Sequence, residues 1–117
     1  MSKSKRVIVH TQFRQGDVFG RRIATIPTNA TPKPTDPRGA VLAEGGLTGH
    51  HHRIRDPRAA LLRAEGVAYD LLTIEGARPV SLVHEEHLPI YIGGGHFEIR
   101  RQSEWDWSED LARQVQD

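Results

Sequence analysis

The chain has 117 residues, and its 16 basic and 15 acidic side chains give a net charge of +1 with neutral histidines. This length fits one domain with a real hydrophobic core, and the balanced charge excludes the strongly basic surface of a dedicated nucleic-acid binder. The absence of cysteine excludes disulfides, thiolate metal ligands and cysteine nucleophiles. No apolar run approaches the roughly 20 residues that a membrane span needs, so we expect a cytoplasmic protein without a membrane partner.

The first third of the chain predicts β-structure interrupted by one long loop. Residues 1–6 form a short basic arm, and the β-branched and aromatic stretch 7–13 (VIVHTQF) predicts a strand. A turn at residues 15–17 leads into a second predicted strand at 18–26. Four prolines within residues 27–39 exclude a helix or a central strand there, so we expect an extended surface loop.

The middle of the chain continues this pattern of short apolar segments. Residues 40–44 (AVLAE) predict a short strand that runs into the glycine-rich GGLTG and three consecutive histidines. Residues 59–64 fit a helix or a strand, whereas residues 66–74 (GVAYDLLTI) favour a strand. Residues 79–92 indicate one long strand, or two strands joined at Pro89.

The last part of the chain predicts one more strand and then a helix. Residues 96–102 alternate apolar and polar side chains, as expected of a strand with one solvated face. Ser108 has the character of an N-cap for a short helix at 108–117. The absence of β-α-β alternation and the frequent turns favour an all-β domain over residues 7–107, a small antiparallel sandwich or barrel that carries the C-terminal helix.

The most informative feature of the sequence is the placement of its histidines. His50, His51 and His52 are consecutive, and in a strand His50 and His52 face one side while His51 faces the other. Imidazole is the commonest metal ligand in proteins. An H-x-H pair preceded by three glycines therefore predicts two imidazole ligands with space beside them.

A second pair, His84 and His87, flanks Glu85 and Glu86 in LVHEEHLPI. In an unbroken strand the two histidines would face opposite sides, and a bulge or turn between them would bring both inward. Three imidazoles with a water form an open zinc site of the catalytic kind, and four ligands form a closed one. The two glutamates are then candidates for an oxygen ligand, a hydrogen-bond partner of an imidazole, or a general base.

The spacing of H50-x-H52, Asp56 and the later Gly93-x-x-His96 resembles the two-part histidine pattern of the cupin superfamily. That resemblance implies a cupin-like barrel with a metal held by His50, His52 and His96, with Asp56 standing where glutamate is usual. The stretches TGHHHRI, LVHEEHLPI and GGGHFEIRRQSEWD also resemble small bacterial proteins of unassigned role. Argued from the residues alone, the ligand set is His50, His52, His84 and His87.

Without cysteine the expected metal is zinc, iron, nickel, manganese or copper. The leading hypothesis is a histidine-centred divalent metal site, which would suit a metal-dependent enzyme. The alternative is a non-enzymatic subunit of a homo-oligomer or of a larger protein or RNA assembly, with its histidines in solvated loops or at interfaces. The contact surface would then include the N-terminal arm and a C-terminal group of arginine and tryptophan side chains: Arg100, Arg101, Trp105 and Trp107.

Overall fold

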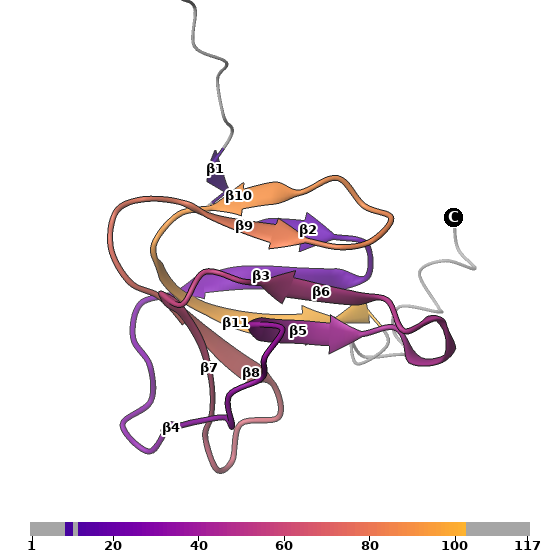
Figure 1. Cartoon of the computed structure of the whole chain (residues 1–117). Helices are drawn as coiled ribbons and strands as arrows, with labels where there is room; N and C mark the ends of the chain where they lie inside the picture. Colours follow the sequence, from indigo (N-terminus) through magenta and orange to yellow (C-terminus); the bar gives the residue numbers. More distant parts are fainter. Residues whose placement is uncertain (1–8, 11, 103–117) are drawn as a thin grey trace, which may run out of the picture.

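The computed structural model describes residues 9, 10 and 12–102, which form a sandwich of two β-sheets (Figure 1). The elements, in chain order, are β1 (Val9–His10), β2 (Phe13–Gln15), β3 (Val18–Ile23), β4 (Thr31–Pro32), β5 (Ala40–Glu44), the 3-10 turn η1 (Gly46–Thr48), β6 (His51–Ile54), β7 (Ala59–Arg63), β8 (Asp70–Ile74), β9 (Val80–Val83), β10 (Ile90–Ile92) and β11 (Gly95–Arg101).

The strands divide into two sheets that interleave distant parts of the chain. Sheet I has the order β1-β10-β9-β6-β5, and sheet II has the order β2-β3-β11-β8-β7-β4. Neighbouring strands are antiparallel, apart from the parallel pairing of the short β1 with β10. The predicted all-β antiparallel architecture is confirmed in its sandwich form. The basic arm at 1–6 and the predicted helix at 108–117 lie outside the described residues.

The core fills the space between the two sheets. Apolar side chains alternate inward along the strands, as the period-2 patterns in the sequence predict. Phe13 and Phe97 meet edge to face with ring centroids 5.6 Å apart. The sequence predicts a weakened or bulged strand at Gly20, but Gly20 pairs regularly with Phe13 and Ile99. A Cβ atom at Gly20 would overlap the Phe13 ring, so the glycine makes room for the aromatic pair.

Two segments predicted as single strands are divided in the structure. The stretch 7–13 contributes β1 to sheet I and begins β2 of sheet II, so the chain changes sheets between them. The stretch 79–92 forms β9 and β10, which are connected by residues 84–89. The ambiguous stretch 59–64 is a strand, β7, because it pairs along its length with β8. No helix in the described part of the chain is long and apolar enough to cross a membrane.

Two Asp-Pro-Arg sequences form turns of the same construction. In each, the aspartate Oδ1 accepts hydrogen bonds from the backbone N–H and Nε of the arginine, while Oδ2 accepts from Nη2, at 2.8–3.1 Å. The Asp36–Arg38 turn precedes β5, and the Asp56–Arg58 turn precedes β7. Arg58 also donates to the backbone carbonyls of Glu75, Arg78 and Pro79, which ties its turn to the β8–β9 connection.

Candidate metal centre

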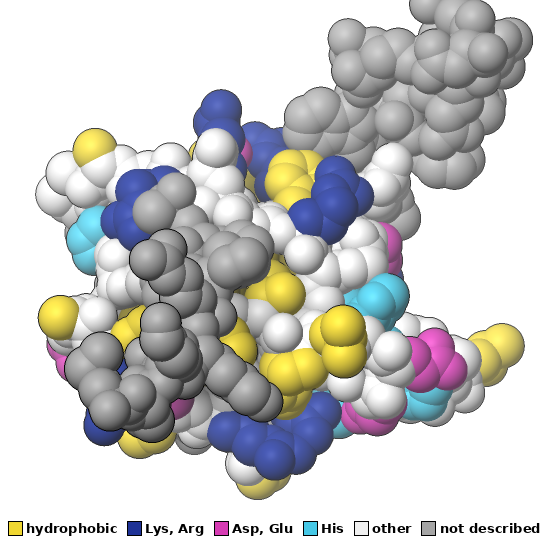
Figure 2. Space-filling view, turned by 90° about the horizontal axis from the view of Figure 1, so that it is seen from above, with side chains coloured by type: hydrophobic (Ala, Val, Ile, Leu, Met, Phe, Trp, Pro, Cys, Tyr) yellow, Lys and Arg dark blue, Asp and Glu magenta, His cyan; other side chains and the backbone are white. Residues whose placement is uncertain are grey.

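Three connections meet at one end of the sandwich (Figure 1). They are the β2–β3 turn at residues 16–17, the β5–β6 connection through η1, and the β9–β10 loop at 84–89. Together they carry His50, His84 and His87, and His52 lies on the adjoining strand β6. Figure 2 shows histidine and acidic side chains gathered at this end, where the β5–β6 connection projects. Gly46 and Gly49 have φ angles of 65° and 73°, so glycine is needed to turn the chain sharply before the histidines.

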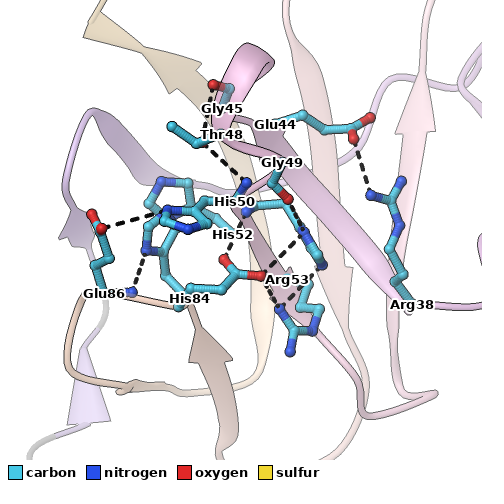
Figure 3. A network of polar contacts seen from close by, with 12 residues as sticks. Arg38, Glu44, Gly45, Thr48, Gly49, His50, His52, Arg53, His84 and Glu86 are labelled. Carbon is cyan, nitrogen blue, oxygen red and sulfur yellow. Dashed lines mark hydrogen bonds and ion pairs between the residues drawn. The ribbon is translucent and has the colours of Figure 1, made fainter.

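The three consecutive histidines alternate sides as the strand geometry requires. His52 is buried in the interior of the sandwich, and His50 lies beside it at the loop end. His51 faces the other side of β6, where its Nε2 lies 3.1 Å from Nη1 of Arg53. The predicted pairing of His50 with His52 on one face is therefore present in the structure (Figure 3).

The β9–β10 loop brings both of its histidines to this pair. β9 ends at Val83, and the following turn lets His84 and His87 approach each other with ring centroids 4.7 Å apart. The His84 ring lies 4.3 Å from that of His52 and 5.6 Å from that of His50, and His87 stacks 5.8 Å from His52. His50, His52, His84 and His87 thus form one cluster of four imidazoles, which we call the histidine cluster.

The proton on His52 is fixed by a buried glutamine from sheet II. Both N–H groups of the Gln15 amide are used, because Nε2 donates to the carbonyls of Leu82 and Leu88 at 2.9 and 3.0 Å. The Gln15 Oε1 atom lies 2.8 Å from His52 Nδ1 and can only accept. His52 is therefore protonated at Nδ1 and has a free lone pair at Nε2, the arrangement that metal-ligating histidines adopt.

The free nitrogen of His52 faces a carboxylate from the β2–β3 turn. His52 Nε2 lies 3.4 Å from Asp17 Oδ1, and with neutral His52 neither atom has a proton to donate. Two ligand atoms bound tetrahedrally to one zinc ion at about 2.1 Å are separated by about 3.4 Å. The spacing of this pair therefore suits a shared cation. A Cβ atom on Gly16 would lie 2.7 Å from His87 Nε2, so the glycine leaves room for that ring.

Two imidazoles of the cluster, His52 and His84, have lowered pKa values. The pKa of His52 is lowered to about 4, first by burial and then by the neighbouring His84, while Asp17 opposes this effect. The pKa of His84 is also lowered, first by burial and then by His87. Neutral imidazole is the form that binds metals, so near pH 7 these two rings need no deprotonation before binding.

The two glutamates of the β9–β10 loop have different environments. Glu85 accepts a hydrogen bond from the His51 backbone N–H at 2.9 Å and one from Arg53 at 3.3 Å. The first of these contacts lowers the pKa of Glu85 to about 2, so its carboxylate stays ionised. Glu86 is mostly exposed, and its carboxylate lies 3.7 Å from His50 Nδ1. Glu85 thus suits an oxygen ligand, whereas the exposed Glu86 has the solvent access that a general base needs.

Donor atoms of His50, His84 and Glu85 all lie within 4.8 Å of one another. They form one side of the cluster, and buried His52 with the half-exposed Asp17 forms the other. His84 Nδ1 accepts a hydrogen bond from the Glu86 backbone N–H at 3.0 Å, which places the proton of neutral His84 on Nε2. A metal at His84 must therefore displace this N–H or reverse the tautomer, so binding would move the Glu85–Glu86 turn.

The ligands implied by the cupin resemblance do not all come together. His96 is the second residue of β11, whose start lies at the opposite end of the sandwich from the histidine cluster (Figure 1), and its Nδ1 lies 2.9 Å from Thr73 Oγ1. Arg101, at the cluster end of the same strand, is five residues away, or roughly 16 Å. Asp56 is held by Arg58 in its Asp-Pro-Arg turn.

The C-terminal surface predicted from the sequence is described only in part. Arg101 contacts Asp17 at 3.2 Å, and Arg100 lies over the Tyr69 ring at 4.3 Å and contacts Glu98 at 3.4 Å. Trp105 and Trp107 lie outside the described residues. Asp17 and Gln15 are site residues that the sequence reasoning missed, since a turn between two strands gives no sign of which distant loop it will meet.

Fold and site together define a small β-sandwich with a histidine cluster at one end. Residues 14–102 match a protein family described as a domain of unknown function (DUF8820), and the chain belongs to that family. No curated protein and no solved structure matches the chain. Since the description of the family names no activity, the cupin resemblance remains a prediction.

Replacing Gln15 with methionine tests the buried amide network. The change would leave the carbonyls of Leu82 and Leu88 and the Nδ1–H of His52 without their partner. We expect the free energy of unfolding to fall by at least about 2 kcal/mol, measured by urea denaturation. Gln12→Met, at an exposed position, is the matched control. Equal stability of the two variants would contradict this account of Gln15.

The lowered pKa of His52 predicts that the protein loses stability in mild acid. Between pH 6.5 and pH 4 the unfolded chain binds a proton at this histidine while the folded chain does not, so the free energy of unfolding falls as the pH falls. One such group gives a slope of at most about 1.4 kcal/mol per pH unit. Denaturation at several pH values should show a shallower slope for His52→Gln. An unchanged slope would contradict the assignment.

Proposed function

We propose that this chain is a divalent metal-binding module whose centre is the histidine cluster. The observation that carries the proposal is the convergence of His50, His84 and Glu85, whose donor atoms lie within 4.8 Å of one another. The donors are nitrogen and oxygen atoms, which suits zinc, iron, nickel, manganese or copper. His52, which is buried, and the half-exposed Asp17 supply a second donor pair beside the same cluster.

The charges around the cluster support a cation there. Glu85 remains ionised near neutral pH, and Asp17 has a pKa lowered by Arg101, against the opposing effect of its burial. The two carboxylates supply negative charge, and His52 and His84, whose pKa values are lowered, supply lone pairs without requiring a proton to leave. The exposed Glu86 beside His50 gives that side of the cluster a base that could act on a metal-bound water, the chemistry that a metal-dependent enzyme would use.

Metal content and affinity test this proposal directly. Untagged wild-type protein, the His50→Ala/His84→Ala double variant and a His96→Ala control would be compared by elemental mass spectrometry and by calorimetric titration with Zn²⁺. We expect about one equivalent of metal in the wild type and in the control, and affinity reduced at least 100-fold in the double variant. His96 is the matched control because it lies at the other end of the sandwich.

Two outcomes would contradict the proposal. One is the absence of bound metal from folded wild-type protein, both as isolated and after titration. The other is equal loss of affinity in His96→Ala and in the double variant. A His52→Ala variant would then show whether the His52–Asp17 pair contributes. Loss of affinity in this variant, but not in the double variant, would place the metal between His52 and Asp17.

Two exposed leucines favour the second candidate function, a subunit that assembles through the end of the sandwich where the histidine cluster lies. Leu47 at the tip of η1 is fully exposed, and Leu88 in the β9–β10 loop is 86% exposed. Both side chains lie in loops that also carry the histidine cluster. Large exposed apolar side chains beside a polar cluster are typical of contact surfaces between proteins.

The assembly hypothesis predicts a change of oligomeric state when these side chains become polar. Wild-type protein at micromolar concentration should elute as a homo-oligomer in size-exclusion chromatography with light scattering. The Leu47→Ser/Leu88→Ser variant should shift to the monomer with little loss of stability, because neither side chain packs in the core. A monomeric wild type, with or without Zn²⁺, would count against assembly and leave the metal proposal standing.

A further inference from the structure

A second feature, separate from the histidine cluster, is a cleft of about 890 Å³ along the edge of the sandwich. Residues 32–39 form one side of it, and β5, β6 and β7 form the other. Its apolar wall includes Val41, Ala60 and Leu61 together with prolines of the long loop. The volume lies within the range of small-molecule binding sites.

The cleft is lined by four cationic and three anionic side chains, and most of them are already paired. Arg38 contacts both Asp36 at 2.8 Å and Glu44 at 3.0 Å. Asp56 is held by Arg58, whose side chain does not line the cleft. All three lining carboxylates are therefore in ion pairs with arginine, and two of them share Arg38.

Lys33 is also occupied, because it contacts Asp70 at 2.8 Å. The remaining lining cations are Arg53 and Arg55, which lie two residues apart and face the same side of the chain. Arg53 shares its guanidinium between Glu85 and His51. Arg55 is exposed and forms no ion pair or hydrogen bond with any residue in the described ranges. Among the described residues, the cleft therefore has one unpaired guanidinium, that of Arg55, beside an apolar wall.

We propose that this cleft binds a small amphipathic anion, an oxyanion carried on a compact apolar body. Arg55 contacts the oxyanion with its unused donors, Arg53 adds a second guanidinium beside it, and Val41, Ala60 and Leu61 cover the apolar body. Arginine recognises carboxylate and phosphate oxygens with the same planar pair of donors, so either group fits this chemistry.

The test is a titration of the full chain followed by backbone amide NMR shifts. The probes are phenyl phosphate and benzoate, with neutral benzamide to measure apolar contact alone and inorganic phosphate to measure the anion alone. We expect the amides of Val41, Arg55 and Leu61 to shift with phenyl phosphate or benzoate, and the stronger of these two arms identifies the anion. Benzamide and inorganic phosphate should bind at least tenfold more weakly.

The decisive variant is Arg55→Gln, which removes the charge without breaking any contact within the described chain. We expect at least tenfold weaker binding of the preferred probe and an unchanged melting temperature. Arg14→Gln is the matched control, since Arg14 lies on β2 at the opposite edge of sheet II. The proposal would be overturned if wild type and Arg55→Gln bound the probe equally well, or if benzamide bound as well as benzoate. It would also be overturned if only the amides of His50 and His84 shifted, or if no probe bound.

Discussion

The side-chain amide of Gln15 is the interaction on which the rest of the structure depends. It extends from sheet II to the backbone of Leu82 in sheet I and to Leu88 in the β9–β10 loop, and it also contacts His52. One buried group thus joins the two layers, fixes the loop that carries His84 and His87, and sets the tautomer of His52. A buried polar network of this kind stabilises one arrangement only when every member has a partner.

The histidine cluster and the cleft lie on opposite sides of β6, and one carboxylate, that of Glu85, contacts residues of both sites. His51 and Arg53 face the cleft, whereas His50 and His52 face the histidine cluster, because successive side chains of a strand point to opposite sides. Glu85 spans the two, since it accepts from His51 and Arg53 and belongs to the donor group of the cluster. An anion that engages Arg53 would therefore compete with Glu85 for that guanidinium.

The sequence predicts the elements and the local side-chain directions better than it predicts their neighbours. Alternation along one strand is enough to place His50 beside His52, and the turn expected between His84 and His87 is present. The end of the sandwich at which His96 lies is determined by the register of β11 against β3. The Gly-x-x-His motif contains no information about that register. Asp17 and His52 are separated by 35 positions in the sequence, and they come into contact only because the two sheets pack together.

Long sequence separation also determines when the histidine cluster can exist during folding. Gln15 contacts Leu82 across 67 positions and His52 across 37, and closing such loops costs entropy that is recovered only when both sheets are in place. A short zinc-binding segment can use its metal to organise the chain. This sandwich must instead assemble its strands before the donor atoms meet, so a nascent or partly unfolded chain would lack the cluster and metal uptake would report complete folding.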